Sequence, residues 1–103
     1  ALKMIMSTLV KRLKEARLRA ALSQEQLGIL AGIDPASASA RMNRYELGKR
    51  VPDLALVEKL GDVLGVPTAY FLAATNEEAE LLLKFHRLQE AKKAQALDYI
   101  RHL

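Results

Sequence analysis

The sequence contains no cysteine and no tryptophan, and glycine, proline and aromatic residues are sparse. Without cysteine the chain can form neither disulfide bonds nor thiolate metal sites. Because aromatic residues make up only 5% of the chain, the core must be built largely from aliphatic side chains. Half of the 103 residues are apolar and 27% are charged, as in folded proteins rather than disordered ones. Helix formers dominate, so the composition predicts an all-α fold.

Long hydrophobic runs are also missing. No apolar stretch approaches the roughly 20 residues that a helix needs to cross a bilayer, so we expect no membrane contact. The apolar part of the opening segment ALKMIMSTL is too short for a signal peptide. The reducing cytoplasm is therefore the expected compartment, in keeping with the lack of cysteine.

Positive charge is concentrated in the first three-quarters of the chain. Residues 1–75 carry 11 basic and 7 acidic side chains, whereas residues 76–103 carry 5 of each. The net charge of +4 therefore lies entirely in the first segment. A basic segment of this kind favours an anionic partner such as nucleic acid.

Apolar periodicity and capping residues predict helices over 8–21, 23–31, 40–47, 54–64 and 69–73. Ser7 or Thr8 is expected to cap the first helix. Ser23 and Gln26 are expected to form a capping box for the second helix. The buried stripe of that helix is expected to consist of Leu27, Leu30 and Ala31. Asp53 and Thr68 are expected to cap the fourth and fifth helices. Asp34 followed by Pro35 can start a further helical turn before residue 40.

A second boundary is predicted at Thr75-Asn76, where Asn76 is a good N-cap. The chain from there to Leu103 has no glycine or proline, so we expect two helices, or one helix bent near residues 88–91. This segment has two apolar stripes, which we expect to hold a homodimer together; their residues are Leu81, Phe85 and Leu88, and Leu97, Ile100 and Leu103.

The stretch 23–50 combines two short amphipathic segments joined at Ala31-Gly32-Ile33. The second segment is polar and basic, which is typical of a helix that enters the DNA major groove. Arginine can bind guanine through two hydrogen bonds, and asparagine can bind adenine in the same way. We expect the polar side chains to lie on the face opposite Met42 and Tyr45. The residues expected to contact bases or phosphates there are Ser39, Ala40, Arg41, Asn43 and Arg44.

Three pieces of the sequence, LKEARLRAALSQEQLGILAGI, RMNRYELGKRVPD and LVEKLGDVLGVPTAYFL, resemble the xenobiotic-response-element family of helix-turn-helix regulators, the lambda repressor and Cro type. The resemblance covers about residues 9–72. It implies a five-helix, lambda-repressor-like DNA-binding domain over 8–74, followed by a helical extension over 76–103. One departure is a segment between Gly32 and Arg41 that is about four residues longer than the usual turn, which leaves the register of the third helix open.

The resemblance also implies roles for individual residues. Gln24 matches a glutamine that touches the phosphate backbone at the start of the second helix. Lys49 and Arg50 follow the third helix, where a loop commonly meets phosphates. Arg17 and Glu46 match an internal salt bridge between the first and third helices.

These observations predict a sequence-specific regulator that binds double-stranded DNA, acting as a homodimeric repressor on a palindromic operator. Two alternatives remain open: an antitoxin that binds DNA and a protein toxin, and an adaptor that binds only protein. No catalytic set or phosphate loop is recognisable, so we expect neither an enzyme nor a cofactor. His86 and His102 have no ligand partners at suitable spacing, so we expect no metal.

Overall fold

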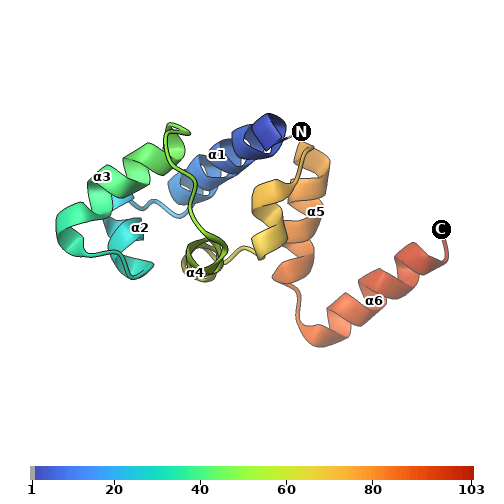
Figure 1. Cartoon of the computed structure of the whole chain (residues 1–103). Coiled ribbons are helices and arrows are strands. Elements are labelled where there is room, and N and C mark those ends of the chain that lie inside the picture. Colours follow the sequence, from blue (N-terminus) through green and yellow to red (C-terminus); the bar gives the residue numbers. More distant parts are fainter. Residues whose placement is uncertain (1) are drawn as a thin grey trace.

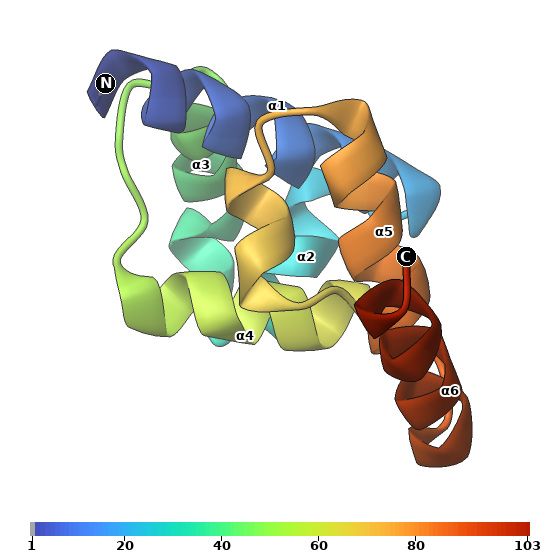
Figure 2. The same ribbon diagram turned by 90° about the vertical axis from the view of Figure 1, so that its right-hand side faces the viewer.

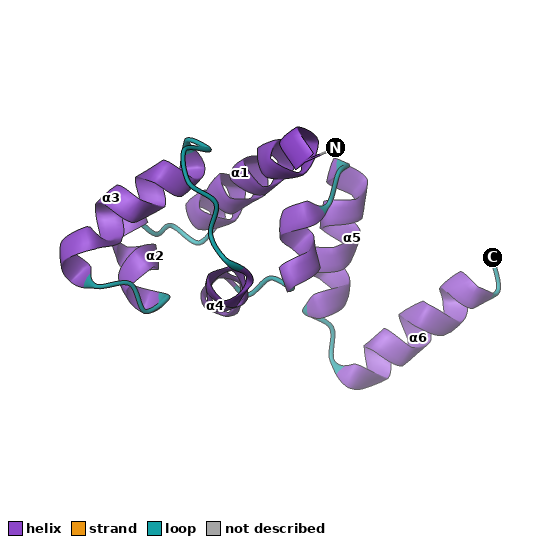
Figure 3. Cartoon of the chain, viewed as in Figure 1, coloured by secondary structure: helices purple, strands orange, loops and turns teal. Residues whose placement is uncertain are grey.

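The computed structural model describes residues 2–103, which form helices and connecting loops without any strand (Figures 1 and 3). The elements are α1 (Leu2–Arg19), α2 (Gln24–Leu30), α3 (Pro35–Glu46), α4 (Leu54–Leu64), the 3-10 helix η1 (Thr68–Leu72), α5 (Asn76–His86) and α6 (Glu90–Arg101). The predicted all-α fold is confirmed.

α1 begins at Leu2 rather than at Thr8, so the prediction of a cap at Ser7 or Thr8 is wrong. The segment before Thr8 contains no glycine or proline, and its lysine, methionines and leucine favour helix, so nothing interrupts the helix there. Thr8 lies inside the helix, where its Oγ1 donates a 3.0 Å hydrogen bond to the carbonyl of Met4. The added turns carry exposed apolar side chains at Leu2, Met4 and Ile5.

The turn between α2 and α3 is short, and α3 begins at Pro35 instead of residue 40. The Asp34 carboxylate accepts a 3.0 Å hydrogen bond from the Ala36 N–H, and Pro35 occupies the first helical position. The additional residues before Arg41 therefore lengthen α3 at its N-terminal end rather than enlarging the turn. At the start of α2, the capping box of Ser23 and Gln26 is present as predicted.

The core lies where α1, α2, α3, α4 and η1 meet (Figure 2). Its fully buried large side chains are Leu13, Leu27, Met42, Leu60, Tyr70 and Phe71. The two aromatic rings meet edge to face, with centroids 5.8 Å apart. Leu30 was predicted to be buried but is 61% exposed, because the seven-residue α2 turns Leu27, Gly28 and the following Ala31 toward the core instead.

Two caps differ from the prediction where the chain enters η1 and α5. Thr68 does not cap η1, because Pro67 precedes that helix and no side chain caps it. α5 is capped by Thr75, whose Oγ1 accepts a 3.1 Å hydrogen bond from the Glu78 N–H. Asn76 is therefore free for another role, and its Oδ1 accepts a 3.1 Å hydrogen bond from the buried Arg12.

α5 and α6 are separate helices, which agrees with one of the two predicted arrangements. α5 packs on η1 and contributes Ala79 and Leu83 to the core. α6 buries none of its residues and projects away from the other helices (Figure 1). Within residues 2–103, no helix combines the length and the apolar character needed to cross a membrane.

Gly28 allows α2 and α3 to approach each other closely. A Cβ at this position would lie 2.9 Å from the Ala38 Cβ and 3.1 Å from the Met42 Cγ. We expect Gly28→Ala to lower the free energy of unfolding by about 1–3 kcal/mol, because overpacking outweighs the better helix propensity of alanine. Urea unfolding followed by circular dichroism measures this change. The control Glu25→Ala, on the exposed side of α2, should change stability little, and equal effects of the two substitutions would contradict the prediction.

Candidate nucleic-acid interface

The outward face of α3 is polar or small along its whole length. The opposite face is buried through Ala38, Met42 and Tyr45. The exposed residues are Pro35, Ala36, Ser39, Ala40, Asn43 and Arg44. Four of these six were predicted as interface residues. Pro35 and Ala36 were missed because the additional N-terminal turn of α3 was not recognised, although the Asp34-Pro35 cap was the signal for it.

Gln24, the first residue of α2, lies beside this face of α3. Its Nε2 donates 3.3 Å hydrogen bonds to the Asn43 Oδ1 and to the Glu46 Oε1. The side chain thus connects the start of α2 to α3 at the boundary between the exposed face and the core. Gln24 and Asn43 form one continuous polar surface that combines two helices.

The salt bridge implied by the family resemblance is present between Arg17 of α1 and Glu46 of α3. The Arg17 guanidinium donates to both carboxylate oxygens, with distances of 2.6 Å from Nε and 2.9 Å from Nη2. A third bond of 3.0 Å joins its Nη1 to the carbonyl of Leu22, just before α2. The hydrogen bond to Glu46 raises the pKa of Arg17 above its usual value, so the ion pair stays charged. One arginine thereby ties α1, α2 and α3 together.

Arg41 does not lie on the face opposite Tyr45, so that part of the prediction is wrong. The two residues are four positions apart in α3, which places them on the same side of a helix. The Arg41 Nη2 donates a 2.7 Å hydrogen bond to the Tyr45 hydroxyl, and its Nε is buried without a partner among residues 2–103. The guanidinium is therefore held at the edge of α3's outward face.

Lys49 and Arg50 lie in the exposed loop after α3, as predicted. The Arg50 guanidinium is 5.9 Å from the Tyr45 ring centroid, and that of Arg41 is 5.8 Å from it. Both distances are within the range of cation–π attraction. Two arginines are thus positioned by one buried tyrosine beside the end of α3.

The residues predicted to form a dimer remain accessible in the single chain. Leu97 is 40% exposed, Ile100 46% and Leu103 87%, whereas Leu81 and Leu88 on the α5 side are 57% and 37% exposed. Phe85 is half-buried, and the Lys93 ammonium lies 5.8 Å from its ring centroid. In residues 2–103, no three metal-ligating side chains gather in one place.

The Arg17–Glu46 pair generates a stability prediction. The two side chains are 11% and 4% exposed, so removing the carboxylate charge leaves Arg17 largely buried and unpaired. We expect Glu46→Gln to lower the free energy of unfolding by roughly 3 kcal/mol, near the lower limit for such pairs because the amide oxygen still accepts one bond. Chemical denaturation provides the measurement.

The matched control is Glu90→Gln, which removes the same charge from a pair with Lys93 at 3.4 Å. There the glutamate side chain is 92% exposed, so solvent already screens the attraction. The control should unfold like the parent chain. A comparable loss of unfolding free energy in both variants would show that the buried pair stabilises the fold no more than the exposed pair does.

Comparison with known proteins agrees with this geometry. Residues 8–70 match the helix-turn-helix domain family. The chain is 34% identical over 71 residues to YonR of Bacillus subtilis strain 168, described as an SPbeta prophage-derived uncharacterized HTH-type transcriptional regulator. This match covers 69% of the chain and 62% of YonR.

The crystal structure of transcriptional regulator BswR is 46% identical to the chain and superposes with a TM-score of 0.85, covering 91% of the chain and 93% of BswR. Neither relative is described as an antitoxin, so the comparisons give no support to that alternative. The family match spans more than half of the chain and coincides with the helices that carry the polar face of α3. The chain therefore belongs to the helix-turn-helix domain family.

Proposed function

We propose that this protein is a transcriptional regulator that binds double-stranded DNA by inserting α3 into the major groove. The observation that carries the proposal is the outward face of α3, which is exposed, free of acidic side chains and held rigidly by Arg17 and Glu46. The only carboxylate of α3 is that of Glu46, and Arg17 neutralises it. The relatives described as regulators, and the resemblance to the lambda repressor type, support the same function.

Asn43 and Arg44 are the side chains best suited to read bases. Asparagine can bind adenine, and arginine guanine, each through two hydrogen bonds in the major groove. Ala36, Ser39 and Ala40 are small, so they allow the N-terminal half of α3 to approach the base edges closely. Their methyl and hydroxyl groups can also contact thymine methyl groups or base edges.

Contacts with phosphates would come from residues on either side of α3. The Gln24 amide at the start of α2 and the exposed cations Lys49 and Arg50 supply donors without sequence information. For Arg41 we propose a phosphate contact rather than a base contact, because Tyr45 holds its guanidinium beside the outward face. The two arginines near Tyr45 would then lie along one DNA strand.

We further propose that the protein acts as a homodimeric repressor, with α6 at the centre of the dimer. α6 buries nothing within its own chain yet exposes Leu97, Ile100 and Leu103. A twofold axis through this element would present two copies of α3 to half-sites about 34 Å apart, or a multiple of this distance. Occupation of such a site would block transcription sterically.

Selection of bound fragments from random duplex DNA tests the function directly. It should recover a palindromic sequence whose two half-sites are separated, centre to centre, by about one helical turn or a multiple of it. Affinity for the selected duplex should fall steeply with salt, because bound phosphates release counterions. Failure to enrich any duplex would overturn the proposed function, as would an affinity for DNA that does not change with salt concentration.

Substitutions should separate base contacts from phosphate contacts. We expect Asn43→Ala or Arg44→Ala to cost about 1–3 kcal/mol on the selected duplex and to relax its preference at one position in each half-site. Lys49→Ala should weaken all duplexes alike and reduce the salt slope by about one. Fluorescence anisotropy on duplexes with single base changes provides the measurement, and Lys92→Ala in α6 serves as the control. Unchanged preference in both α3 variants would show that another surface reads the sequence.

The dimer proposal predicts that Leu97→Glu converts a dimer into a monomer, because a charge would be buried in the apolar interface. Gln95→Glu adds the same charge on the opposite side of α6 and should leave the dimer intact. Sedimentation equilibrium of the full chain measures both. A parent chain that is monomeric at tens of micromolar would contradict the proposal, as would a Leu97→Glu variant that remains dimeric.

A further inference from the structure

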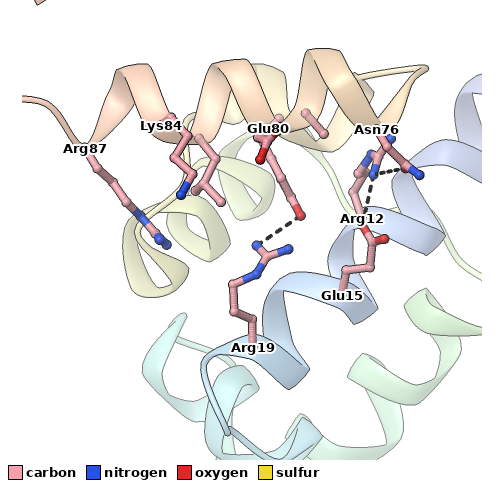
Figure 4. A pocket seen from close by; sticks show the side chains of 10 residues that line it. Arg12, Glu15, Arg19, Asn76, Glu80, Lys84 and Arg87 are labelled. Carbon is pink, nitrogen blue, oxygen red and sulfur yellow. Dashed lines mark hydrogen bonds and ion pairs between the residues drawn. The ribbon is translucent and has the colours of Figure 1, made fainter.

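A cavity of about 340 Å³ opens between α1, η1 and α5 (Figure 4). It lies at the end of the bundle away from α3, with α1 and α4 between the two (Figure 1). The cavity is therefore separate from the surface proposed to bind DNA. Its volume falls at the lower end of the roughly 300–1,000 Å³ that is typical of small-molecule sites.

Cationic side chains from two walls converge on this cavity. Arg12 and Arg19 come from α1, whereas Lys84 and Arg87 come from the facing side of α5 (Figure 4). The lining contains four cations but only two carboxylates, those of Glu15 and Glu80. Glu15 is already paired with Arg12 at 3.0 Å, and neither Arg19 nor Lys84 forms an ion pair within residues 2–103. The cavity therefore holds excess positive charge on both sides.

The α1 wall combines one buried arginine with one exposed arginine. Arg12 is only 2% exposed, and its Nε and Nη1 donate to the Ala73 carbonyl and the Asn76 Oδ1 at 3.0 and 3.1 Å. Its Nη2 makes no hydrogen bond with residues 2–103, so this donor is free to bind a ligand. Arg19 donates a 3.3 Å bond to the Tyr70 hydroxyl, and both guanidinium groups lie about 6 Å from the Tyr70 ring centroid.

The α5 wall is more open. Lys84 is exposed and points into the cavity, and the Arg87 Nε donates a 3.3 Å bond to the Gly65 carbonyl at the end of α4. Between the two walls, Ala79 and Leu83 supply an apolar surface. The cavity thus combines a cationic rim with an apolar and aromatic lining, which is the composition of a site for a small organic anion.

We infer that this cavity binds a small molecule with two anionic groups, phosphate or carboxylate, one directed to α1 and the other to α5. Planar guanidinium groups match the oxygen atoms of either anion. A single monovalent anion would leave one wall uncompensated, whereas a dianion neutralises both. The apolar lining accommodates the short carbon or bridging segment between the anionic groups.

Such a ligand would link α1 to α5 by contacting both helices. In the single chain, α5 reaches the bundle chiefly through η1 and the Asn76 bonds to Lys11 and Arg12. Because α5 leads directly into α6, a bound dianion would stabilise the position from which α6 projects. The ligand is thus placed to act as an effector of the proposed dimer.

Isothermal titration of the full chain with pyrophosphate, succinate and orthophosphate tests the site without DNA. We expect saturable binding of pyrophosphate or succinate, weaker binding of orthophosphate, and no effect of sodium chloride at equal ionic strength. Lys84→Gln combined with Arg19→Gln should reduce the affinity at least about tenfold. Lys92→Gln, which removes an exposed charge from α6, should leave it unchanged.

Hydrogen exchange provides a second readout, since a dianion that joins the walls should slow exchange of the α5 amides. Absence of saturable binding by all three anions would overturn the inference, as would equal affinity in the double variant and the control. Binding that does not slow hydrogen exchange in α5 would show that the ligand does not link α1 to α5. Because neither measurement involves DNA, failure of the site and failure of the proposed function can be told apart.

Discussion

The Arg17–Glu46 ion pair is the contact on which the orientation of α3 depends. It joins α1 to α3 through two hydrogen bonds, and Arg17 also bonds to the Leu22 carbonyl before α2. Gln24 adds a bond from the start of α2 to the same carboxylate. Because the pair is largely buried, its desolvation is balanced only if this geometry is kept. The packing of Gly28 against Ala38 then sets how close α2 and α3 can lie.

α1 organises both ends of the molecule through two arginines. Arg17 points toward α3 and the proposed DNA surface, whereas Arg12 points toward Ala73, Asn76 and α5. The two arginines differ in how completely they are neutralised. Both oxygens of the Glu46 carboxylate accept from Arg17, whereas Arg12 shares its cavity with three further cations. The same helix therefore carries a structural ion pair toward α3 and part of the cavity wall toward α5.

Local sequence signals predicted some helix boundaries correctly and missed others. The capping box of Ser23 and Gln26, the cap at Asp53 and the break before α6 are all present. The start of α1 was missed because a pattern of core-facing residues does not register helical turns that lie outside the core. α3 starts before residue 40 because Asp34 and Pro35 supply a cap and a first-turn proline that the apolar pattern of 40–47 does not include.

The sequence by itself determined the helical composition, the amphipathic α2 and α3, and the basic character of the segment that contains them. These features follow from residue type and spacing within a few turns of helix. Only the tertiary structure decided that Asn76 accepts a hydrogen bond from Arg12 instead of capping α5, and that four cations surround one cavity. Such contacts join side chains whose rotamers or partners are set by packing between helices, and sequence spacing does not specify them.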